Sequence, residues 1–90
     1  MNTEIRATLL QFPCEFPIKA FGHNRPNFDG LIVEIVRRHV PNLSEGAVTA
    51  RPSHGGKYTA VTVTIRAESQ AQLDAIYQDL TRCNEVLMAL

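Results

Sequence analysis

The chain has no excess of charge of either sign. Its 90 residues contain nine lysines and arginines against nine aspartates and glutamates. Proteins that bind nucleic acid through accumulated positive charge usually carry a clear excess of lysine and arginine. The adjacent Arg37 and Arg38, and a second group of Arg51, Lys57 and Arg66, are therefore interpreted as solvated surface charge. Nucleic acid is disfavoured as a partner on this ground.

Long apolar runs and paired cysteine motifs are also missing. No segment approaches the ~20 apolar residues that span a bilayer. The opening residues, MNTEIRATLLQF, lack the basic and then apolar pattern of a secretory signal. The two cysteines, Cys14 and Cys83, form no CxxC pair. We therefore expect a cytoplasmic protein with reduced thiols, no membrane contact, and no metal or other cofactor.

The strands of the chain are indicated by alternating apolar and polar residues. The clearest is the segment KYTAVTVTIRA, in which Val61, Val63 and Ile65 share one face and polar residues the other. The adjacent glycines of HGG predict a hairpin turn before it. Strands are expected over residues 16–22, 47–53, 57–67 and 85–90.

Two segments show the three- and four-residue apolar spacing of amphipathic helices. The first lies between Pro26, which suits a first helical turn, and Pro41, which cannot continue a helix. The second follows Ser69, which forms a capping box with Gln72. The apolar stripes are Phe28, Leu31, Ile32, Ile35, Val36 and Val40 in the first, and Leu73, Ile76, Tyr77 and Leu80 in the second.

The order of these elements predicts an α+β fold, the ferredoxin-like βαββαβ sandwich. Both helices must cover one face of a four-stranded antiparallel sheet, with the first and third strands in the middle. Residues 1–15 are expected to form an N-terminal arm, and residues 16–90 a single domain. The last strand, from Val86 to Leu90, is continuously apolar at a sheet edge, which favours pairing. The arm, or the same strand of a second subunit in a homo-oligomer, would cover it.

A candidate ligand site precedes the first helix. Free backbone N–H groups at a helix start attract anions, and Asn24 and Arg25 would contact a carboxylate or phosphate beside Gly22 and His23. The alternative is an ordinary turn that binds nothing. The three histidines show no metal-ligand spacing. His39 is interpreted as a cap at the C-terminal end of the first helix.

The polar face of the sheet is a second candidate site. Sheets of this topology that bind RNA present aromatic side chains on that face, and Phe21 and Tyr58 are available for stacking. The dense aromatic pattern of such proteins is missing, and strand propensity alone explains the threonines. The residues assigned to this open face are Lys19, Tyr58, Thr62, Thr64 and Arg66.

Several runs together resemble the YbeD family, which comprises small bacterial proteins of unknown function. These runs are LLQFPCEFPIKAFG, VEIVRRHVP, PSHGGKYTAVTVTIRA and the terminal VLMAL. The resemblance implies a ferredoxin-like fold similar to the ACT regulatory domains, which bind amino acids. In ACT domains the ligand lies in the loop that corresponds to residues 22–27 here. The usual acidic residue and Pro-Gly pair of that loop are missing from this sequence.

The function expected from these observations is a non-enzymatic regulatory or interaction module. It would bind a small anionic metabolite or a partner protein, and no catalytic residues are assigned. The alternative is an RNA-binding module that uses the open sheet face. A small enzyme is the third possibility, since the partners of a catalytic triad meet only in space.

Overall fold

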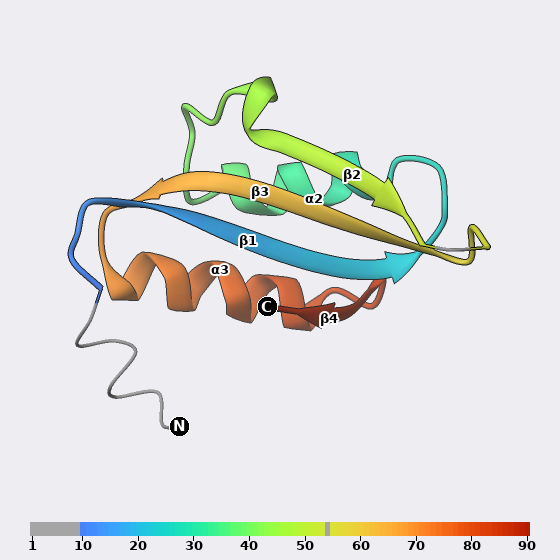
Figure 1. Ribbon diagram of the computed structural model, residues 1–90. Coiled ribbons are helices and arrows are strands. Elements are labelled where there is room, and N and C mark those ends of the chain that lie inside the picture. Colours follow the sequence, from blue (N-terminus) through green and yellow to red (C-terminus); the bar gives the residue numbers. More distant parts are fainter. Residues whose placement is uncertain (1–9, 54) are drawn as a thin grey trace.

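The computed structural model describes residues 10–53 and 55–90 (Figure 1). The tip of the N-terminal arm, including Leu9, and His54 lie outside the described residues. The chain forms the predicted ferredoxin-like βαββαβ arrangement, with one additional short 3-10 helix. The elements are β1 (Cys14–His23), α2 (Phe28–Arg37), η1 (Glu45–Ala47), β2 (Val48–Pro52), β3 (Tyr58–Ala67), α3 (Gln70–Arg82) and β4 (Val86–Ala89).

The four strands form one antiparallel sheet in the order β2-β3-β1-β4. Figure 1 shows the long strands β1 and β3 side by side, with β2 along one edge and the short β4 beside the other. Ile18 lies opposite Val63, and Ala20 opposite Val61, so the buried residues of both central strands share one face. The predicted central and edge positions are therefore confirmed.

The first strand is longer than its sequence pattern suggested. It begins at Cys14, opposite Ala67, instead of at Phe16. Pro17 lies inside this strand without breaking a ladder bond. Lys19 exchanges both backbone bonds with Leu90 of the β4 segment, so its backbone N–H faces β4. The nitrogen of Pro17, two residues earlier, faces the same side, but Pro17 lies beyond the residues of β1 that pair with β4.

Both helices pack on the same face of the sheet, as predicted. Their buried residues join those of β1 and β3 in one cluster. The first helix ends at Arg37, yet Val40 remains buried in the turn before Pro41. No helix within the described ranges is long and apolar enough to cross a membrane. The buried cluster consists of Phe16, Ile18, Ala20, Phe28, Ile32, Ile35, Val36, Val40, Val61, Val63, Ile65, Ala67, Leu73, Ile76 and Leu80.

The start of the second helix follows the predicted capping arrangement. Ser69 has extended backbone, and its hydroxyl accepts a hydrogen bond of 3.1 Å from the N–H of Gln72. The side-chain oxygen of Gln72 accepts a bond of 2.7 Å from the N–H of Glu68, one residue before the usual position. The hairpin before β3 is also confirmed, because Gly55 and Gly56 have φ values of 88° and 72°.

The described part of the N-terminal arm lies against the domain. Leu10 and Phe12 are partly buried and pack on the core, together with Cys14 at the start of β1. Cys83, at the end of α3, packs on the same core, as expected for a small apolar residue. Both thiols are unbridged.

Candidate functional site

The polar groups of the connection between β1 and α2 are largely engaged within the protein. Gly22 and His23 belong to β1, and the ring of His23 lies 5.4 Å from that of Tyr58. The side-chain amide of Asn24 donates a bond of 2.9 Å to the carbonyl of Gly56. Its oxygen accepts a bond of 2.9 Å from the Thr59 hydroxyl. Asn24 therefore ties this connection to the β2–β3 hairpin.

The remaining residues of this connection also have local roles. Arg25 approaches Glu85, with 3.8 Å between Nε and Oε2, so its charge is already compensated. Asn27 occupies the N-cap position of α2 with a left-handed φ of 66°, and its side chain makes no capping bond. An anion bound at this helix start would therefore have to replace contacts that Asn24 and Arg25 already make within the protein.

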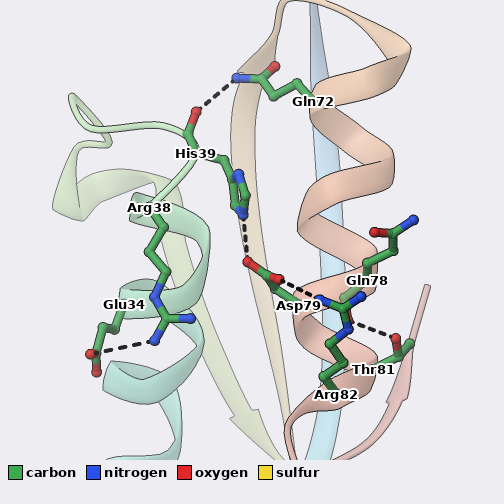
Figure 2. Close-up of polar contacts among 8 residues, drawn as sticks. All are labelled: Glu34, Arg38, His39, Gln72, Gln78, Asp79, Thr81 and Arg82. Carbon is green, nitrogen blue, oxygen red and sulfur yellow. Dashed lines mark hydrogen bonds and ion pairs between the residues drawn. The ribbon is translucent and has the colours of Figure 1, made fainter.

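The two helices are joined by a group of polar contacts (Figure 2). The ring Nε2 of His39, just after α2, lies 2.7 Å from Oδ2 of Asp79 on α3. The amide of Gln72 donates a bond of 3.1 Å to the backbone carbonyl of His39. The interpretation of His39 as a cap on its own helix is therefore wrong. The turn after α2 directs the ring toward α3, where a carboxylate accepts its bond.

The hydrogen bond from His39 lowers the pKa of Asp79 below its ordinary value of 3.8, and the nearby charges of Arg38 and Arg82 act in the same direction. A carboxyl whose pKa is lowered by folding stabilises the folded state while ionised. That contribution is present above the unfolded pKa and is lost as the pH falls through the folded pKa. The contact between Asp79 and His39 should therefore stabilise the packing of the two helices at neutral pH and lose this effect in acid.

We expect Asp79→Asn to reduce the dependence of stability on pH in acid. In the native protein the free energy of unfolding should fall as the pH drops below about 4, because Asp79 must then take up a proton. The asparagine variant should be less stable at neutral pH, and its free energy of unfolding should fall less steeply as the pH drops. Urea unfolding at a series of pH values measures this. Asp74→Asn, the same change at an exposed position of the same helix, should keep the native slope.

The open face of the sheet carries every residue that the sequence assigned to it. Tyr58, Thr62, Thr64 and Arg66 alternate with the buried positions of β3, and Lys19 does so on β1. They are not equivalent, however. Arg66 pairs with Glu68, with 3.4 Å between Nε and Oε1, near one end of the sheet, whereas Tyr58 contacts His23 near the other.

Two rows of side chains cross the middle of this face. In one row Lys19 lies opposite Thr62, which lies opposite Thr49. In the next row Phe21, Ala60 and Arg51 occupy the same three strands. Together with Ala50, these six residues line a hollow of about 410 Å³. We call it the open-face hollow.

The edge strand β4 continues both rows. Met88 lies opposite Phe21, and the backbone of Leu90 exchanges bonds of 3.0 and 2.8 Å with that of Lys19. Leu87, Met88 and Leu90 expose 54%, 54% and 57% of their surface. The molecule therefore presents a strip of exposed apolar side chains along one edge of its sheet.

Comparison with known proteins agrees with this fold. The family described as "Protein of unknown function (DUF493)" matches residues 7–90. The chain belongs to this family. A UPF0250 protein of Paraburkholderia phytofirmans is 46% identical over 79 residues, which cover 88% of this chain and 89% of the relative. A UPF0250 protein of Chromobacterium violaceum is 46% identical over 82 residues, which cover 91% and 92%.

The DUF493 family is the one that the sequence resembled under the name YbeD, so that recognition is confirmed. The solution structure of protein HP0495 from H. pylori matches 100% of this chain and 94% of its own, with a TM-score of 0.70. The identity is 12%, so this likeness shows the shared fold alone. The curated relatives are uncharacterised, so the function of this family member must be inferred from its surface.

Sequence reasoning missed four residues on the open face of this DUF493 protein: Thr49, Arg51, Met88 and Leu90. Their placement depends on how β2 and β4 pair with the central strands, and a single sequence does not give that register. Alternation in residues 47–53 could have grouped Thr49 with Arg51. It could not have placed them beside Lys19, which is about thirty residues away along the chain.

Proposed function

We propose that this DUF493 protein is a non-enzymatic interaction module that works as a dimer, joined by antiparallel pairing of β4 with β4 of a second copy. The observation that carries the proposal is the composition of this edge. Residues 86–90 include no charged residue and no proline, although they lie at a sheet edge with three exposed large apolar side chains. Edge strands normally carry charged residues or proline, which prevent pairing with another strand.

The backbone of β4 is arranged for a further strand. Leu90 exchanges both of its bonds with Lys19, so Ala89 occupies the alternate position of the ladder. Its N–H and C=O consequently point away from β1 and toward the outer edge. A strand added there would accept and donate these bonds at low cost, because both partners are already extended.

The opposite edge of the sheet is protected. Strand β2 ends in Arg51 and Pro52, and a proline cannot donate a ladder bond. Pairing of β4 with β2 of another copy is therefore disfavoured, whereas pairing of β4 with itself brings no like charges together. A contact of one edge with itself closes after two copies, which favours a dimer over a fibre.

The register that uses all of residues 86–90 places Met88 opposite Met88 of the second copy. Leu87, which has no partner on β1 because the register of β4 shifts there, then lies opposite Ala89, whose outward backbone groups are available. Such a contact is small, below the roughly 1,200 Å² of a standard interface, so a weak dimer is expected. The exposed apolar strip would become continuous across the joined sheets.

The location of Asp79, the carboxyl group whose pKa is lowered, supports the non-enzymatic part of the proposal. The pKa of Asp79 is lowered by a structural contact between helices, and that carboxylate is occupied by His39. Perturbed groups that serve catalysis are usually gathered in a cleft. Here the lowered pKa is explained by the packing of α2 on α3.

Sedimentation velocity over a range of protein concentrations tests the dimer. The expected dissociation constant lies between about 10 µM and 1 mM, in the range of weak interfaces. Met88→Lys would place two positive charges face to face and should leave a monomer at every concentration. Ala89→Pro removes the outward N–H without removing a bond to β1, and should weaken the dimer by about tenfold or more.

Ala71→Lys is the matched control, because it adds the same charge at an exposed position at the far end of α3 and should dimerise like the native protein. Backbone amide spectra of each variant check that the monomer fold is kept. A native protein that stays monomeric up to about 1 mM contradicts the proposal. So does a dimer that both β4 variants leave intact.

A further inference from the structure

We infer that the open-face hollow binds a small anion that carries a flat apolar body, such as an aryl carboxylate or aryl phosphate. The hollow lies within one copy, over the middle of β1, β3 and β2, and none of its lining residues belongs to β4. The inference therefore stands on residues other than those that carry the proposed dimer, and each can fail without the other.

The shape of the hollow follows from the sizes of the side chains in its two rows. Neighbouring strands lie about 4.8 Å apart, so the residues on β1 and β2 stand about 10 Å from one another across β3. On β3 the two rows hold only Ala60 and Thr62, whereas the flanking strands carry Lys19, Phe21 and Arg51. Long side chains on both sides of short ones leave a depression of about 410 Å³.

The charged side chains that line the hollow are all positive. Its lining includes Lys19 and Arg51 and no acidic residue. Among the side chains that the structure describes, which leave out Glu45, no carboxylate lies within 4.0 Å of either cation. Four other arginines do have such a neighbour, namely Arg25, Arg38, Arg66 and Arg82.

The nearest acidic side chain on the same face of β1 is Glu15. It lies four residues from Lys19, about 13 Å along the strand, beyond Pro17. An anion placed between Lys19 and Arg51 would therefore meet two positive charges, with no acidic side chain of β1 beside it on that face. Arginine can bind a carboxylate or phosphate with two parallel hydrogen bonds, which adds directional preference.

The apolar part of the ligand is indicated by Phe21. This side chain is half-buried in β1, between Ala60 on β3 and Met88 on β4. It offers an aromatic surface beside the cations, and a flat apolar body would cover it and displace water. The hydroxyls of Thr49 and Thr62 line the same hollow and can donate to the anion. Inorganic phosphate would use the charges but leave the ring exposed.

Titration of the full-length protein followed by amide NMR tests this inference, with benzoate and phenylphosphate as probes. Both should shift the resonances of Lys19, Phe21, Thr49, Arg51 and Thr62. Benzamide, which has the same apolar body without the charge, and inorganic phosphate should each bind at least about tenfold more weakly. Equal binding of inorganic phosphate would overturn the role assigned to the apolar body.

Matched variants locate the site. Lys19→Met and Arg51→Gln should each weaken phenylphosphate by about tenfold or more, since each removes a charge-assisted contact. Lys57→Met and Arg66→Gln make the same changes outside the hollow and should bind like the native protein. An equal loss in all four variants means that only general surface charge is sensed, and overturns the inference.

A short single-stranded RNA serves as a competitor. If it shifts the same resonances at lower concentrations than phenylphosphate, and Tyr58→Ala removes that binding, the face is a nucleic-acid surface and the small-anion inference is wrong. If RNA binds no better than inorganic phosphate, the preference for a small aryl anion is supported.

Discussion

Leu80→Ala should lower the free energy of unfolding by about 2–5 kcal/mol. Leu80 lies on α3 with 0% of its surface exposed, within the cluster that joins both helices to the sheet. Its truncation removes apolar contacts and leaves a cavity that a rigid sheet can fill only in part. The loss is a large share of the roughly 5–15 kcal/mol that stabilises a domain of ordinary size.

Urea unfolding measured by circular dichroism gives the result, with an expected fall in midpoint of roughly 1–3 M. Leu87→Ala is the control, because the residue and the change are the same but the side chain lies on the exposed edge strand. At low micromolar protein, where the proposed dimer is dissociated, it should change stability by less than about 0.5 kcal/mol. Similar losses in the two variants would show that the assigned core is wrong.

Most of the fold could be predicted from the sequence because the apolar pattern has a different period in each kind of element. Alternation identified the buried faces of both central strands, and helical spacing identified Leu73, Ile76 and Leu80. Once both helices have one apolar stripe and the best strand has one apolar face, a single two-layer arrangement buries all of them. The alternating pattern does not set the ends of the strands, and β1 starts two residues earlier than expected.

The sites could be predicted much less well, because they depend on contacts between distant parts of the chain. Asn24 was assigned to a ligand from its position before a helix, yet it bonds to Gly56 and Thr59. His39 was assigned to its own helix, yet its ring meets Asp79 forty residues away. A local pattern gives the residue type that a turn needs. It does not show which distant group satisfies that residue.

Gly22→Ala should also destabilise the protein, by about 1–3 kcal/mol. The sequence placed Gly22 in a candidate ligand loop, but the structure gives it a packing role at the end of β1. A Cβ atom added there would collide with the ring of Phe28 and the backbone carbonyl of Glu85. The ring is held in the core and the carbonyl belongs to the turn before β4, so neither can move freely. Thermal unfolding measures the loss.

Gly30→Ala is the matched control, since an added Cβ would meet no atom within 4 Å. Gly30 lies inside α2, where alanine is favoured over glycine by about 0.5–1 kcal/mol, so this variant should be more stable than the native protein. The same chemical change is thus expected to act in opposite directions at two positions only eight residues apart. If Gly22→Ala instead matched or exceeded native stability, the close approach of β1 to α2 and β4 would be contradicted. The apolar edge inferred for pairing rests on that placement of β4, and the dimer proposal would then fail with it.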